Sequence, residues 1–154
     1  MEERRLRILT HLALMPAILV FALSACSMPR IVVLHDPLSA KEHIDLGVIY
    51  EQRGMLDLAE KEYLKAVDKQ GTWAIPYFNL GNLAYKRQNL KAAEGYYRKA
   101  LTLDNQNPDI MNNLASLLHE TGRDDEARTL IEKALSLQRK DEYLDTQRTI
   151  KGGE

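Results

Sequence analysis

AKEHIDLGVIYEQRGMLDLAEKEYLKAVDKQGTW at residues 40–73 is followed directly by AIPYFNLGNLAYKRQNLKAAEGYYRKALTLDNQN at residues 74–107. The two stretches align without an insertion and share ten identities, among them Leu46/Leu80, Gly47/Gly81, Ala59/Ala93, Tyr63/Tyr97 and Ala66/Ala100. A third stretch, residues 108–141, keeps the same skeleton with Leu114, Ala115, Ala127, Ile131 and Ala134. Self-similarity at a fixed period predicts a stack of like structural units.

Within each copy the apolar residues follow the spacing of two amphipathic helices. The break between the two helices falls at Gly54, at Gln88-Asn89 and at Gly122, where a turn residue tolerates the left-handed backbone conformation. Thr72 and Asn107-Pro108 mark the copy boundaries, and Asn as N-cap with Pro at the first helical position is a start signal. Ser39-Ala40-Lys41-Glu42 is a capping box, so we expect helical structure to begin there.

Small residues in the first helix of each copy, at Gly47, Gly81 and Ala115, stand where paired helices must approach closely. With the aromatic and alanine positions of the second helix, this pattern resembles the tetratricopeptide repeat. The resemblance implies an all-α, right-handed superhelical α-solenoid of three repeats, at 40–73, 74–107 and 108–141. No Pro ends a second helix, and Leu118 replaces the Tyr50 of the first copy. A helical-hairpin array of another family is the alternative.

Residues 142–154 follow the third copy, and Tyr143, Leu144 and Ile150 give them a thin apolar edge. We expect a C-terminal capping helix and a frayed tail. The segment forms either a separate, solvated capping helix or a straight extension of the last repeat helix.

Residues 1–25 have the plan of a signal peptide, with Arg4, Arg5 and Arg7 before an apolar run from Ile8 to Ala22. Such a run spans about 22 Å as a helix, short of the ~30 Å hydrocarbon core of a bilayer. The run ends in Leu23-Ser24-Ala25-Cys26, which resembles the bacterial lipobox. The resemblance implies cleavage before Cys26 and a covalent lipid on that cysteine. A structural cysteine behind an ordinary signal, and a retained single-pass anchor, are the alternatives.

Residues 26–39 would then form the lipidated N-terminus and an extended tether. Ser27 stands where many Gram-negative lipoproteins retained at the inner membrane carry Asp, so the resemblance favours an outer-membrane protein that faces the periplasm. The apolar run from Ile31 to Leu34 either packs on the first repeat, covers part of the concave face lined by the first helices, or contacts a partner.

Composition and charge exclude several functional classes. The 154 residues carry 21 Lys+Arg and 22 Asp+Glu, a formal charge of -1, so no basic surface for nucleic acid is expected. One cysteine excludes an internal disulfide and a Cys-based zinc site. His43 occupies a position that the other copies fill with bulky residues, which favours packing over metal binding. We expect runs such as Glu60-Lys61-Glu62 to be solvated helix surface with i,i+4 pairing. We expect no cofactor and no catalytic activity; a small hydrolase using His119 with Glu120 or Asp124 is the enzyme alternative.

Function is therefore expected from surface shape. In tetratricopeptide arrays the first helices line a concave groove that takes a peptide or a partner helix. Transferred by position, the groove residues are Ile44, Val48, Glu51, Phe78, Asn82, Tyr85, Asn112, Ser116 and His119. The family's carboxylate clamp is not implied, because its Lys and Asn positions hold Ile44 and Val48. Asn79 and Asn113 are expected to tie neighbouring backbone together.

The sequence thus predicts a non-enzymatic protein-binding module tethered to the bacterial envelope. The leading role is that of an adaptor or assembly factor for an envelope complex such as a pilus or secretion system. Two alternatives are a tethered adaptor that regulates a cell-wall enzyme, and association of two copies into a homodimer through an exposed end.

Overall fold

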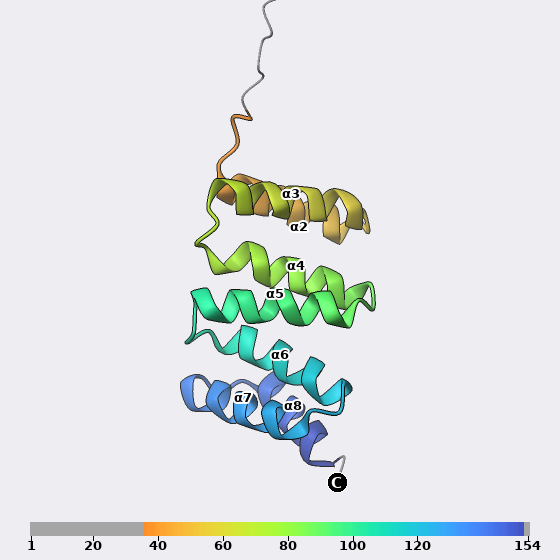
Figure 1. Cartoon of the computed structure of the whole chain (residues 1–154), viewed down its shortest axis with the longest axis vertical. Helices are drawn as coiled ribbons and strands as arrows, with labels where there is room; N and C mark the ends of the chain where they lie inside the picture. Colours follow the sequence, from red (N-terminus) through yellow and green to blue (C-terminus); the bar gives the residue numbers. More distant parts are fainter. Residues whose placement is uncertain (1–35, 153–154) are drawn as a thin grey trace, which may run out of the picture. The chain divides into compact units, whose positions relative to one another are not determined.

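The computed structural model describes residues 36–152, and these fold into seven α-helices with no β-strand among them (Figure 1). The predicted signal peptide, Cys26 and the run from Ile31 to Leu34 lie outside the described residues. The helices are α2 (Ala40–Gln52), α3 (Leu56–Lys69), α4 (Ala74–Lys86), α5 (Leu90–Leu103), α6 (Pro108–Glu120), α7 (Asp124–Leu137) and α8 (Asp141–Gly152).

The helices pack as three consecutive hairpins, α2 with α3, α4 with α5, and α6 with α7, and the hairpins stack in chain order (Figure 1). The first helix of each hairpin begins at residue 40, 74 or 108, the positions at which the three sequence copies begin. The fold is an all-helical α-solenoid of repeats, which confirms the predicted fold class. None of the described helices is long and apolar enough to cross a bilayer.

The turns inside the three hairpins adopt the left-handed backbone conformation at the predicted residues. Gly54 has φ of 73°, Gln88 has φ of 60° and Gly122 has φ of 75°. Glycine adopts this conformation freely, whereas a side chain costs about 1–2 kcal/mol there. The middle hairpin therefore makes its turn with a residue that is strained at that position.

The helix starts follow two of the three predicted signals. Ser39 and Glu42 form both hydrogen bonds of the capping box. The Asn107 side chain accepts from the backbone N–H groups of Asp109 and Ile110, and Pro108 occupies the first turn. At the remaining boundary, marked by Thr72, the N-cap is Trp73, and no side chain caps the helix.

The helices of each hairpin meet at the predicted small residues. A Cβ built on Gly47 would lie 2.4 Å from the Tyr63 ring, and one built on Gly81 would lie 2.5 Å from the Tyr97 ring. Only glycine fits below these rings. The third hairpin has Ala115 at this position because its partner is the smaller Ile131, and both side chains are fully buried.

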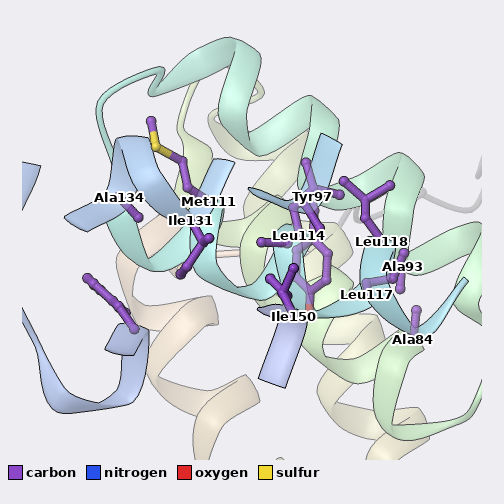
Figure 2. Close-up of a cluster of buried hydrophobic side chains, with 13 residues drawn as sticks. Ala84, Ala93, Tyr97, Met111, Leu114, Leu117, Leu118, Ile131, Ala134 and Ile150 are labelled. Carbon is purple, nitrogen blue, oxygen red and sulfur yellow. The ribbon is translucent and has the colours of Figure 1, made fainter. Parts of the chain in front are cut away.

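The largest core cluster lies in the C-terminal half and joins α4, α5, α6, α7 and α8. Figure 2 shows it in close-up, and its labelled side chains include Leu114, Leu117 and Leu118 of α6, Tyr97 of α5 and Ile150 of α8. All five of these side chains are at most 2% exposed. The hairpin α6–α7 thus has neighbours on both sides.

Charged side chains join neighbouring repeats, which corrects the expectation for Glu60-Lys61-Glu62. Glu60 pairs with Arg87 of the next repeat rather than within its own helix.

Glu62 is 7% exposed and binds the Nδ1 atom of buried His43 at 2.7 Å. Burial raises the pKa of Glu62, but hydrogen bonds from Lys65 and His43 outweigh it and lower the pKa below the ordinary value. Glu62 is buried because of its position in the helix: it lies between Ala59 and Ala66 on the stripe of α3 that faces the core.

Helix α8 is a separate helix that packs against α7 and α6, so the predicted alternative of a straight extension is wrong. Helix α7 ends at Leu137, and the backbone of the next residue, Gln138, is extended. Asp141, the last residue of the third sequence copy, is the first residue of α8. The apolar edge of α8, which the sequence predicts to be thin, is nonetheless buried: Tyr143 and Ile150 are 0% and 1% exposed. Lys140 and the Tyr143 hydroxyl both bind Asp109 of α6 and hold the start of α8.

Candidate functional site

Two adjoining hollows lie along the first helices of the repeats and end at α8. The first has a volume of about 500 Å³ and the second about 610 Å³. Tyr85, Ser116, Glu142 and Thr146 line both hollows, so we treat them as one surface and call it the groove. The other residues that line it are Glu51, Asn82, Lys86, Tyr97, Asn112, Asn113, His119, Glu120, Asp145, Thr149 and Ile150.

Three amide side chains and one tyrosine form a hydrogen-bonded cluster in the groove. Asn82 Oδ1 accepts from the Tyr97 hydroxyl at 2.8 Å and from Asn113 Nδ2 at 2.9 Å. Asn113 Oδ1 accepts in turn from Asn112 Nδ2 at 3.3 Å. Asn113 therefore joins two repeats through side chains, rather than through the backbone as predicted.

The same cluster leaves one donor group and one acceptor atom without a protein partner among residues 36–152. Both hydrogen bonds of Asn82 end on its Oδ1 atom, and its NH2 group donates no hydrogen bond to these residues. Asn112 is only 3% exposed, and its Oδ1 accepts no hydrogen bond. A buried amide oxygen without a partner is costly, so such an atom in a groove indicates a position that a ligand or water completes.

The two ends of the groove differ in charge. At the N-terminal end Glu51 is neutralised by Lys86 at 3.1 Å and accepts from the Tyr63 hydroxyl at 2.9 Å. Burial, together with this bond to Glu51, raises the pKa of Tyr63.

At the C-terminal end, Glu120 accepts a hydrogen bond of 2.7 Å from the Tyr85 hydroxyl. This hydrogen bond raises the pKa of Tyr85, and burial of the side chain adds a smaller contribution in the same direction. Glu142 and Asp145 of α8 line the same end. Three carboxylates therefore surround this part of the groove.

The structure brings together six of the nine groove residues predicted from the sequence. Glu51, Asn82, Tyr85, Asn112 and Ser116 line the first hollow, and His119 lines the second with Tyr85 and Ser116. Their role in binding remains a prediction.

The other three predicted residues lie elsewhere. Ile44 is 7% exposed and packs in the core of the first hairpin. Val48 is exposed but lines neither hollow. Phe78 packs against the Tyr97 ring, with centroids 6.0 Å apart, and lines a different hollow beside Ile110.

Sequence reasoning missed the contribution of α8 to the groove, above all Glu142 and Thr146. A signal was present: residue 142 follows residue 108 by one more repeat length, so a helix there takes the place of the first helix of a fourth copy. The weak apolar pattern of this segment concealed that relation.

The residues of the enzyme alternative are each engaged in a side-chain hydrogen bond. His119 Nδ1 binds Asp124 Oδ1 at 2.6 Å, and Glu120 is held by Tyr85. Ser116, one turn away, donates its hydroxyl proton to the Asn112 carbonyl at 3.1 Å. Within residues 36–152, His, Cys, Asp and Glu form no group of three or more that could hold a metal ion.

Comparison with known proteins connects this geometry to a family. Models described as tetratricopeptide repeat match residues 84–148 and 43–68. The type IV pilus assembly protein PilF of Pseudomonas aeruginosa is 33% identical over 85 residues, which cover 55% of this chain and 34% of PilF. Human tetratricopeptide repeat protein 6 is 33% identical over 69 residues, covering 45% of this chain. The chain spans only 13% of that human protein's length.

Among solved structures, the first tetratricopeptide repeat domain of Spaghetti, bound to the HSP90 peptide SRMEEVD, superposes with a TM-score of 0.71. The match covers 79% of this chain and 97% of that domain at 19% identity, so it bears on the fold alone. Hairpin geometry and family models agree. The chain carries tetratricopeptide repeats, a class of domain that typically serves protein–protein interaction.

Proposed function

We propose that the protein is a lipid-anchored periplasmic adaptor or assembly factor that holds a protein partner in its groove while an envelope complex is built. The observation that carries the binding function is the groove itself. The first helix of each repeat, Tyr97 of α5 and α8 contribute side chains to it, and it contains a nearly buried amide with an unused acceptor.

Two further observations support the envelope role. The Leu23-Ser24-Ala25-Cys26 motif supplies a site for a lipid anchor, since one acyl chain gives marginal membrane binding and two or three give a firm tether. The similarity to PilF, a type IV pilus assembly protein, covers 55% of this chain and favours an assembly role. The peptide bound by the Spaghetti domain supports a peptide as the kind of ligand.

A crosslinked pull-down of the full-length protein from its native cells tests the proposal. Ser116→Trp is the groove variant, because Ser116 lines both hollows and is not part of the apolar core. Phe78 is unsuitable for this purpose since its ring packs against Tyr97. Lys61→Trp, at an exposed residue of α3 outside the groove, is the matched control.

The expected result is a partner that the wild type and the Lys61→Trp variant capture and the Ser116→Trp variant loses. Membrane fractionation of Cys26→Ala in the same experiment should show loss of membrane association. A partner captured equally by the groove variant would contradict binding in the groove. Membrane association that persists without Cys26 would contradict the lipid anchor.

A further inference from the structure

The C-terminal end of the groove has an uncompensated negative charge. Among residues 36–152, no Lys, Arg or His side chain forms a salt bridge with Glu120 or Glu142. Asp145 is paired with Arg148 at 2.9 Å, and His119 is engaged with Asp124. Two carboxylates on facing helices, α6 and α8, are therefore available to a ligand.

Glu120 is also held in place. The Tyr85 hydroxyl donates to Glu120 Oε2 at 2.7 Å from the neighbouring repeat, and Tyr85 itself packs against the core. This bond leaves Oε1 free to accept. A fixed carboxylate loses less conformational entropy on binding than a mobile one, so it is well suited to receive a charge-assisted hydrogen bond.

The amide cluster next to this end supplies contacts for a peptide backbone. Asn82 offers its NH2 donor, and nearly buried Asn112 lines the same hollow with an oxygen that accepts no hydrogen bond among the described residues. A peptide group carries one carbonyl acceptor and one N–H donor, which complement this pair. Ser116 and Thr146 line the groove between the cluster and the carboxylates with small side chains.

We infer that the groove recognises an extended peptide segment of a partner protein that carries a Lys or Arg side chain in the hollow lined by Glu120 and Glu142. The inference rests on the proposed function and specifies the chemistry of the ligand. Charge complementarity favours it over an acidic segment: the peptide bound by the Spaghetti domain, SRMEEVD, contains three acidic residues, which these carboxylates would repel.

Selection from a phage-displayed library of random dodecapeptides tests the inference, with the full-length protein in detergent as bait. The peptides selected by the wild type should be enriched in Lys or Arg at one position. The double variant Glu120→Gln/Glu142→Gln keeps the size of both side chains and should lose that enrichment. Glu132→Gln, at an exposed residue of α7 that lines neither hollow, is the matched control and should retain it.

The best selected peptide, made synthetically with a fluorescent label, should bind the double variant at least about tenfold more weakly than the wild type, as expected for one charge-assisted contact. Replacing its Lys or Arg by Glu should weaken binding to the wild type further.

Three results would overturn the inference: selection of no peptide, selection without basic enrichment, or equal enrichment with the double variant. Self-association of the chain that Ser116→Trp abolishes would also overturn it, because a second copy would then occupy the groove. A partner that is lost with Ser116→Trp but binds Glu120→Gln/Glu142→Gln normally would refute the charge preference and leave the proposed function intact.

Discussion

The first and third repeats are built on one pattern but have different neighbours. Leu114, Leu117 and Leu118 of α6 are fully buried, because α8 packs against α6 and α7 and completes their core. In the first repeat, Val48, Ile49, Met55, Leu58 and Leu64 are each at least 36% exposed. The comparison teaches that burial in a repeat protein depends on what is stacked against a hairpin as well as on the hairpin's own sequence.

The largest expected change in the free energy of unfolding comes from truncating a buried apolar side chain. Leu114→Ala removes a fully buried side chain from the third repeat and should lower the free energy of unfolding by about 2–5 kcal/mol. Leu58→Ala, at a residue that is 44% exposed in the first repeat, should change it by less than about 0.5 kcal/mol. Urea denaturation measures both, and equal losses would show that the first repeat is covered as well as the third.

The two glycines of the middle hairpin should respond in opposite directions. Gly81→Ala places a methyl group 2.5 Å from Tyr97 and should cost about 1–3 kcal/mol. Gly95→Ala has no atom within 4 Å of its new Cβ and should gain about 0.5–1 kcal/mol from helix propensity. Thermal unfolding checks the signs. A neutral Gly81→Ala would mean that the ring and the glycine backbone do not meet closely.

The turn of the middle repeat should improve when it is made like its neighbours. Gln88→Gly removes a side chain from a residue with φ of 60° and should raise stability by up to about 1 kcal/mol. Gly122→Gln is the converse change in the third repeat, where φ is 75°, and should lower stability by a similar amount. Unfolding midpoints of the two variants that move in the same direction would contradict this reading of the turns.

The smallest expected effect is the pH dependence of the α8 attachment. Burial raises the pKa of Asp109, but hydrogen bonds from Lys140 and Tyr143 lower it more, so the folded pKa lies below the ordinary value of 3.8. The stabilisation is thus complete above pH 3.8 and is lost as the pH falls through the lower folded value.

Since Asp109 and Lys140 are partly exposed, this contribution should stay below about 1 kcal/mol. Hydrogen exchange of α8 amides in acid measures it. The Asp109→Asn variant is the control and should show a flatter pH response of α8. An unchanged response in that variant would assign the acid sensitivity to another group.

Most of the repeat architecture could be predicted because it depends on local pattern. The 34-residue period, the Ser39–Glu42 capping box, the left-handed turn residues and the small-residue contacts at Gly47 and Gly81 are all properties of short sequence windows. The structure has each of them.

The remaining features depend on residues distant in sequence. Glu62 lies on the buried stripe of its own helix, but its partner His43 belongs to the preceding helix, and the partner of buried Tyr143 is Asp109 of α6. The groove was only partly predictable for the same reason. Transfer by repeat position identified Asn82 and Tyr85, but it placed Phe78 in the groove and omitted Glu142, because the weak apolar pattern of α8 concealed its place as the first helix of a fourth copy.

Site-specific photocrosslinking in cells tests the central claim, that the partner binds in the groove, most directly. A benzophenone amino acid replaces Tyr85 in the groove in one strain and Leu58, an exposed residue of α3 outside it, in another. The account predicts a partner adduct from position 85 and none from position 58. An adduct from position 58 alone would contradict it and would assign binding to the exposed apolar surface of the first repeat.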